Sequence, residues 1–177
     1  MSPDTRGESA PVDDAPWLTA DQQRDWRALL GLLAILPPAL DAQLKRDAGV
    51  NGFEYQVLAV LSEAPDRTVG LSDLAALSQG SLSRLSHAIT RLERSGLVGR
   101  RSCVNQGGRR AEAWLTDTGL ARLEDIAPGH AREVRRLVID VLSPEQLTAV
   151  SDAARAITTA YAAECDGGQG LLGQSCP

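Results

Sequence analysis

Aromatic residues are scarce in this sequence, which has three Trp, two Tyr and one Phe among 177 residues. Its three cysteines, Cys103, Cys165 and Cys176, are odd in number and include no Cys-x-x-Cys pair. They therefore offer neither a disulfide framework nor the ligand spacing of a zinc site, and the two histidines do not complete one. We predict a reduced, cytoplasmic protein that holds no metal and no other cofactor.

Membrane, secretion and catalytic signals are missing as well. No run of 18 apolar residues occurs, so we expect no membrane partner, and the polar N-terminus lacks the apolar region of a secretory signal. The stretch 80–84, Gly-Ser-Leu-Ser-Arg, ends in arginine and not in glycine, so no Gly-x-Ser-x-Gly nucleophile motif is formed there. The GxGxxG match at 168–173 follows an expected helix instead of a strand. We predict that the protein is not an enzyme.

Leucine and alanine are abundant, and apolar residues recur with a helical period through most of the chain. We expect a disordered tail at 1–16, followed by a helical segment at 17–50 that begins after Thr19 and is kinked at Pro37-Pro38. A separate domain is expected at 51–116. Two further helices follow at 117–164, and a flexible tail is expected at 165–177.

The central domain shows the pattern of a winged helix-turn-helix. A short helix opens at Ser72, the turn is Ser78-Gln79-Gly80, and a second helix runs from Ser81 to about Ser95. Two stretches of strand character, 97–103 and 111–116, then flank a polar loop that contains glycine. The predicted fold is mainly α with a small β-hairpin wing, in which a winged domain lies within a helical framework.

The positive charge is concentrated in this domain. Residues 81–110 contain seven arginines, one acid and no lysine, a formal charge of +6 in a chain whose total is −5. The remaining residues therefore carry −11. A basic cluster on an acidic protein is typical of a surface that faces a polyanion, although a solvated helix face is the ordinary alternative.

A helix-turn-helix explains the cluster as a DNA-binding face. The second helix would enter the major groove, and the hairpin would place its arginines along the neighbouring minor groove. The predicted DNA contacts on the helix are Ser81, Ser83, Arg84, Ser86, His87, Thr90 and Arg91. Those on the hairpin are Arg100, Arg101, Asn105, Gln106, Arg109 and Arg110.

The sequence also resembles the MarR family of bacterial transcription regulators. The resemblance is carried by EYQVLAVLSEAPDRTVGLSDLA at 54–75, SLSRLSHAITRLERSGLVGRRSC at 81–103 and RRAEAWLTDTG at 109–119. It implies a homodimer whose interface is formed by segments 17–50 and 117–164, bound as a regulator to a pseudo-palindromic operator. It also implies a repressor released by a small aromatic or phenolic ligand, for which Trp26, Leu30 and Phe53 are the candidate pocket residues.

One position departs from the family pattern. Gly107 stands where an acidic residue usually precedes the arginine of the wing, here Arg109, and this predicts a looser wing or weaker DNA binding. Two alternatives stay open. The chain could be a winged protein-interaction module that no longer binds DNA, or a regulator that responds to oxidation of Cys103.

Overall fold

The computed structural model describes residues 16–105 and 108–168, without the side chains of residues 103–110 and 164–168. The chain divides into two compact units, residues 1–36 and 37–177. Helix α1 (Ala20–Ala48) begins in the first unit. The Thr19 hydroxyl accepts a hydrogen bond from the Gln22 amide at 3.2 Å, and the Gln22 side chain accepts one from the Thr19 amide at 2.9 Å. These reciprocal bonds cap the first turn, as the sequence predicts.

Helix α1 continues through Pro37 and Pro38 and is not split in two there. Each proline removes one backbone donor, so the carbonyls of Leu33 and Ala34 lose their usual partners. Both of these residues are exposed, and water can satisfy their carbonyls. The boundary between the two compact units falls immediately before Pro37.

By length and composition alone, α1 could also cross a membrane, because one 18-residue window has a mean hydropathy of 1.3. Polar and charged residues interrupt the apolar residues of this helix, so it contains no continuous apolar run of 18 residues. Helices of soluble proteins pass the same test, so it is weak evidence for a membrane span.

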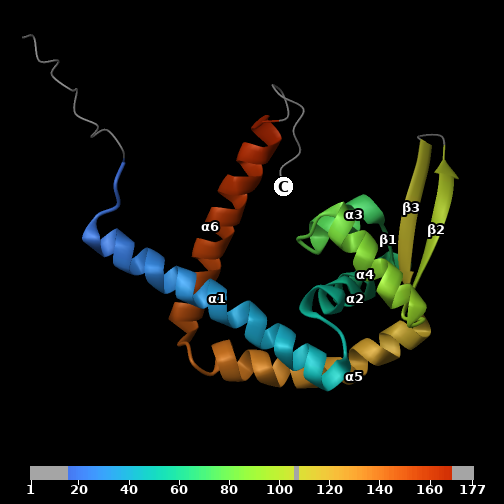
Figure 1. The fold of residues 1–177 in the computed structure, drawn as a ribbon, viewed down its shortest axis with the longest axis horizontal. Helices are drawn as coiled ribbons and strands as arrows, with labels where there is room; N and C mark the ends of the chain where they lie inside the picture. Colours follow the sequence, from blue (N-terminus) through green and yellow to red (C-terminus); the bar gives the residue numbers. More distant parts are fainter. Residues whose placement is uncertain (1–15, 106–107, 169–177) are drawn as a thin grey trace, which may run out of the picture. The chain divides into compact units, whose positions relative to one another are not determined.

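The second unit contains the winged helix-turn-helix predicted from the sequence (Figure 1). Its helices are α2 (Gly52–Glu63), α3 (Leu71–Leu77) and α4 (Leu82–Arg94), and a single 3-10 turn lies at Pro65–Arg67. Strands β1 (Thr68–Gly70), β2 (Val98–Asn105) and β3 (Gly108–Leu115) form an antiparallel sheet in the order β1-β3-β2. The hairpin strands are longer than predicted, because pairing continues to Asn105 opposite Gly108.

One hydrophobic cluster holds this domain together. Helix α2 lies at its centre and contributes Val57, Leu58 and Leu61, which are fully buried. Leu85 and Ile89 of α4 pack into the same cluster. Burial of each such side chain contributes about 1.5–3 kcal/mol, so the inner face of α4 fixes that helix firmly to the domain.

The two ends of α4 are defined by specific caps. Ser81 is the N-cap, and its hydroxyl accepts from the Arg84 amide at 3.2 Å. At the other end Gly96 has a φ of +70°, and the Gly96 and Leu97 amides donate to the carbonyls of Glu93 and Leu92 at 2.9 and 3.0 Å. This pair of bonds is the Schellman motif, which ends the helix at the predicted glycine and turns the chain into β2.

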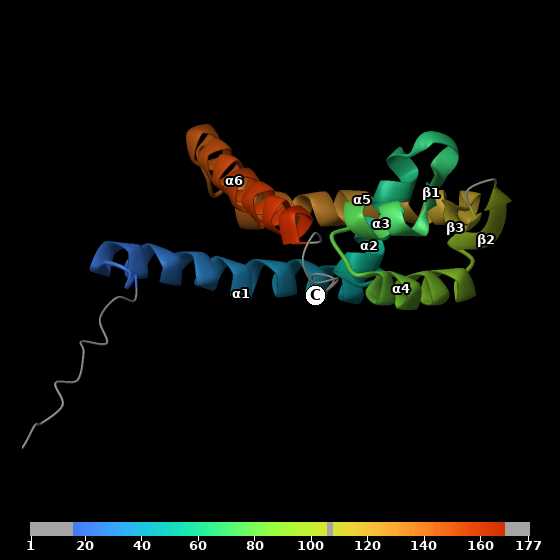
Figure 2. The same cartoon turned by 90° about the horizontal axis from the view of Figure 1, so that it is seen from above.

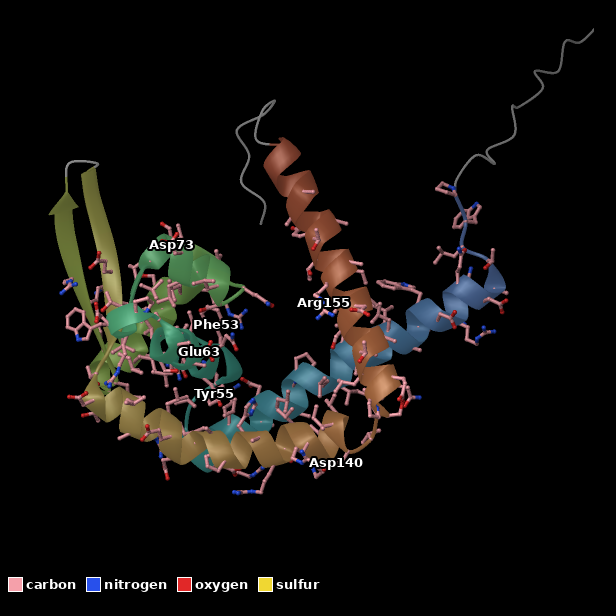
Figure 3. All side chains as sticks on the ribbon, turned by 180° about the vertical axis from the view of Figure 1, so that it is seen from behind. Phe53, Tyr55, Glu63, Asp73, Asp140 and Arg155 are labelled. Carbon is pink, nitrogen blue, oxygen red and sulfur yellow. The ribbon has the colours of Figure 1, made fainter. Side chains whose placement is uncertain are left out.

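Two further helices follow the sheet. Helix α5 (Asp117–Val134) passes into a π-helical turn at Arg135–Ile139, and α6 (Pro144–Gly168) is the last element. Helix α6 extends beyond Glu164, the predicted end of the helical segment, because no proline interrupts the helix after that residue. The His130 ring of α5 lies 4.5 Å from the Tyr55 ring, and Figure 3 shows Tyr55 on the side of α2 that faces α5.

Candidate nucleic-acid interface

Helix α4 presents one polar, exposed face to solvent along one side of the winged domain (Figure 2). Its buried residues are Leu85, Ala88, Ile89 and Leu92. Six of the seven predicted helix contacts are exposed, and the seventh, Thr90, is partly buried. A helix fixed by its apolar side and free on its polar side can enter the major groove without rearrangement of the core.

The residues opposite the buried stripe form the centre of the exposed face. At 3.6 residues per turn these are Ser83, His87, Thr90 and Arg94. The Thr90 hydroxyl donates to the Ser86 carbonyl at 2.9 Å, which fixes its rotamer. Arg94 is not among the contacts predicted from the sequence, although it follows His87 by seven residues and therefore shares its face.

Two predicted contacts, Arg84 and Arg91, lie at the edge of this face nearer to α2. The Arg84 guanidinium carbon lies 4.3 Å from the centre of the Phe53 ring, a cation–π contact. The Arg91 Nε lies 3.0 Å from the Glu54 Oε1. Both arginines remain exposed, yet each is held by a residue at the start of α2.

The hairpin base holds two more of the predicted arginines. Arg100 Nη2 lies 3.2 Å from Glu93 Oε2, and Arg101 Nη2 lies 3.1 Å from Glu112 Oε2. The Arg101 guanidinium also lies 5.8 Å from the centre of the Trp114 ring. These pairs join β2 to α4 and to β3, which fixes the base of the wing relative to the exposed helix.

The predicted contacts at the wing tip are placed only by their backbone. Asn105 pairs with Gly108, Val104 with Arg109, and Cys103 with Arg110. The side chains of all these residues, and both Gln106 and Gly107, lie outside the described part of the chain. The contacts assigned to Asn105, Gln106, Arg109 and Arg110 therefore stay predictions.

Glu54 also belongs to the site, although its side chain is only 3% exposed. Its second carboxylate oxygen, Oε2, accepts from the Asn51 amide at 2.9 Å, while the Asn51 side chain accepts from the Glu54 amide at 2.9 Å. This capping box has a sequence signature, a polar N-cap residue followed three positions later by Glu. That signature could have identified Glu54 as a buried, fixed carboxylate before its contact with α4 was seen.

An open cleft of about 670 Å³ lies beside α4 in the second unit. It is lined by Pro37, Pro38, Asp41 and Lys45 of α1, by residues 51–54 at the start of α2, and by Arg84, His87, Ala88 and Arg91 of α4. Phe53, one of the predicted effector-pocket residues, lines this cleft, and its role in ligand binding stays a prediction. Trp26 and Leu30 belong to the first unit, where they are 48% and 43% exposed.

Comparison with solved structures decides the family. Sco3205 of Streptomyces coelicolor, a MarR family transcriptional regulator solved in complex with DNA, is 39% identical. The match covers 82% of this chain and 91% of that one, with a TM-score of 0.77. The chain belongs to the MarR family of transcription regulators.

A second MarR-family regulator from the same organism, AbsC, agrees with this assignment. It is 37% identical over 84% of this chain and 99% of its own, with a TM-score of 0.77. NadR, solved with 4-hydroxyphenylacetate, shares the fold at 22% identity, 87% and 96% coverage and a TM-score of 0.57. No protein-family model and no curated protein matches the chain. The MarR-family assignment identifies the chain as a DNA-binding transcription regulator.

Asp41, which lines the cleft of this MarR-family chain, provides a test that depends on pH. Its Oδ1 accepts from the Gly52 amide at 2.8 Å, and its Oδ2 lies 2.6 Å from Lys45 Nζ. The Gly52 bond and then the Lys45 bond lower the pKa of the Asp41 carboxyl below its ordinary value of 3.8. The resulting stabilisation is present above that value and is lost as the pH falls through the lower pKa of the folded state.

We expect Asp41→Asn to lower the free energy of unfolding by about 1 kcal/mol at neutral pH, because the amide makes a weaker acceptor for Gly52 and no ion pair with Lys45. The difference from the wild type should shrink as the pH falls below 3.8 and through the lowered pKa of the Asp41 carboxyl, because the wild-type side chain then also becomes neutral. Urea unfolding of the wild type and of Asp41→Asn, carried out from neutral to acidic pH, measures the difference in the free energy of unfolding. A difference that stays constant with pH would contradict the role of the Asp41 charge.

Proposed function

We propose that the protein is a homodimeric, sequence-specific repressor that a small ligand releases from DNA. The observation that carries the DNA-binding part is the exposed polar face of α4 opposite a fully buried stripe. Sco3205, which is 39% identical and was solved in complex with DNA, supports the same proposal of DNA binding. A DNA target places the protein in the cytoplasm, and its role is regulation instead of catalysis.

The predicted contacts take different roles on this face. Ser83, His87 and Thr90, together with Arg94, are placed to read base edges, because they lie opposite the buried stripe. Ser81 and Ser86 lie at the border of the face, and the N-terminus of α4 at Ser81 favours a phosphate. Arg84, Arg91, Arg100 and Arg101 are assigned to the DNA backbone, and Asn105, Gln106, Arg109 and Arg110 to the neighbouring minor groove.

A second subunit would cover apolar residues that are exposed in each unit. In the first unit, Leu33 and Ile35 of α1 are exposed, as are Val150, Ile157 and Tyr161 of α6 in the second. Large exposed apolar surface on a soluble protein is typical of an interface. In a dimer that binds DNA, the two copies of α4 must lie about 34–36 Å apart to enter successive major grooves. The mass of the protein in solution, measured by light scattering, tests the dimer.

The cleft beside α4 is the proposed effector site. Its volume of about 670 Å³ is suited to a small molecule. Phe53 provides an aromatic wall, and Arg84 adds a positive charge suited to the acidic group of an aromatic or phenolic ligand, whereas the charge of Lys45 is paired with Asp41. A ligand there would contact α2 and α4 together, and binding that favours one position of α4 would shift the population away from the DNA-binding form. The same proposal includes Trp26 and Leu30 as residues of the effector pocket.

The pairing of several arginines favours one competing function. Arg91, Arg100 and Arg101 each lie beside a carboxylate, so the net positive charge of the described face is smaller than the sequence suggests. A winged domain that binds a protein partner would tolerate such neutralisation. Redox control through Cys103 remains a separate alternative, because its side chain lies outside the described residues.

Selection of a duplex from a random DNA library, followed by affinity measurement at several salt concentrations, tests the proposal. A specific regulator should bind the selected duplex with a Kd below about 10⁻⁸ M at physiological salt, at least about 1,000-fold tighter than a scrambled duplex. Its affinity should fall steeply between about 50 and 200 mM salt, because phosphate contacts release counterions. Equal, weak binding to both duplexes would favour the protein-interaction module.

A further inference from the structure

The Glu54 carboxylate is buried and uses both of its oxygens. Oε2 accepts from the Asn51 amide at 2.9 Å, and Oε1 lies 3.0 Å from the Arg91 Nε. A buried carboxylate is destabilising unless it is paired and hydrogen-bonded, and here both requirements are met. The hydrogen bond fixes the carboxylate at the start of α2, and the ion pair with Arg91 connects it with the third turn of α4.

Capping alone does not require a charged residue at this position. A capping box needs one side-chain acceptor three residues after the N-cap, and glutamine serves as well as glutamate. A negative charge in the first turn of α2 also interacts favourably with the helix dipole, but the contact of Oε1 with Arg91 is the one that reaches another element. The functional consequence of Glu54 is therefore to be sought on α4.

The contact constrains the guanidinium group of Arg91. The ion pair holds the Nε of this group 3.0 Å from the buried carboxylate, and because the group is planar and rigid, its other donors lie on the side away from Glu54. The Arg91 side chain is 62% exposed, and Glu54 is its ion-pair partner among the described residues. Glu54 thus contacts Arg91 from the side of α2 and leaves the donors on the solvent side of the guanidinium group accessible to a phosphate.

Arg84 is held in a similar way. It lies seven residues before Arg91 on the same side of α4, and its guanidinium stacks on Phe53, the residue next to Glu54. The pattern extends to the hairpin base, where Glu93 and Glu112 are the less exposed partners of Arg100 and Arg101. Such support is therefore found for four of the five arginines on the described DNA-binding face, all except Arg94.

We propose that Glu54 is a positioning residue for DNA recognition, which fixes Arg91 in advance as a phosphate contact at the edge of the recognition helix. Specific binding benefits because Arg91 loses little conformational freedom when the complex forms. The affinity for non-specific DNA is lowered, because the negative charge of Glu54 beside Arg91 reduces the net positive charge that this surface presents to phosphates. This inference rests on the DNA-binding function proposed above.

The test compares Glu54→Gln with Glu63→Gln, a charge-matched change at the exposed end of the same helix (Figure 3). Affinities are measured for the selected duplex and for a scrambled duplex of equal length. Glu54→Gln retains the acceptor for Asn51 but removes the charge that holds Arg91. We expect its ratio of specific to non-specific affinity to fall about tenfold, because the Arg91 side chain must then lose conformational freedom on binding. Glu63→Gln should leave the ratio unchanged.

Arg91→Ala distinguishes positioning from a structural role of Glu54. If Glu54 acts through Arg91, adding Glu54→Gln to Arg91→Ala should not change the ratio further, because no guanidinium is left to orient. An equal fall with and without Arg91 would mean that Glu54 supports the fold only, and it would overturn the inference. An unchanged ratio in the single variant would do the same.

Arg91→Lys provides a second approach if Glu54→Gln does not fold. Lysine keeps the charge, Glu54 and the α2 cap, but it lacks the planar Nε contact, so the ratio should again fall. A ratio equal to that of the wild type would contradict the proposal. Failure of the wild type to prefer its selected duplex would be a distinct result, since it would overturn the regulator function and this inference together.

Discussion

Replacement of Gly119 by alanine is expected to destabilise the protein by about 3 kcal/mol, although alanine is normally the better helix former. Gly119 lies in the first turn of α5 and is buried. A Cβ atom there would lie 2.0 Å from the Leu97 carbonyl oxygen and 2.7 Å from the Leu115 Cδ1. The Leu97 carbonyl also accepts from the Thr116 amide at 3.1 Å, so it cannot move away without loss of that bond.

Thermal unfolding measures this effect. A loss of about 3 kcal/mol corresponds to a fall of about 10 °C in the melting temperature for a chain of this size. Gly129→Ala in the same helix is the matched control, because its Cβ would meet only Gln43 and Arg132 side-chain atoms at 3.7 and 3.9 Å. We expect that variant to be unchanged or stabilised by up to about 1 kcal/mol. Similar losses in both variants would contradict the steric explanation.

Replacement of Ser83 by aspartate is expected to reduce DNA affinity by about 100-fold while the fold is kept. Ser83 is the second residue of α4 and lies at the centre of the exposed face. A carboxylate in the first turn of a helix interacts favourably with the helix dipole and stabilises it by about 0.3–1 kcal/mol. The same charge would meet DNA phosphates, and like charges brought together across an interface destabilise a complex by several kcal/mol.

Binding to the selected duplex and thermal unfolding, measured on the same preparation, test this separation of stability from function. Ser83→Ala removes the hydroxyl without adding charge and should weaken binding by much less. Ala121→Asp places the same charge on an exposed position of α5, which carries none of the proposed DNA contacts, and should leave the affinity nearly unchanged. An affinity of Ser83→Asp close to that of the wild type would show that α4 does not enter the groove.

Local signals were sufficient for most elements of the fold. The N-cap at Ser81 and the C-terminal Gly96 are both found at the predicted ends of α4, because caps act within a few residues. Of the apolar residues that recur with a helical period in α4, Leu85, Ile89 and Leu92 are buried, whereas Leu82 in the first turn is 57% exposed. The prolines at 37 and 38 were less informative, since an exposed helix can lose two backbone bonds to water and continue.

The functional surface was predicted less completely. Arg94 was omitted although its spacing from His87 places it on the exposed face, and the attachments of Arg84 and Arg91 were not foreseen. A linear pattern shows that an arginine is on a polar face, but it does not show which carboxylate or ring lies beside it. Those partners, Phe53 and Glu54, precede Arg84 and Arg91 by 31 and 37 residues in the chain.

The sequence by itself determined the order of the elements, the two ends of α4 and the location of the basic cluster, because these depend on periodicity, caps and composition. Only the tertiary structure decided how that charge is used. Packing of α4 on α2 brings the buried Glu54 carboxylate to Arg91, and pairing of β2 with β3 brings Glu112 to Arg101. Electrostatic interactions depend on distance and burial, and folding sets both quantities between residues far apart in the chain.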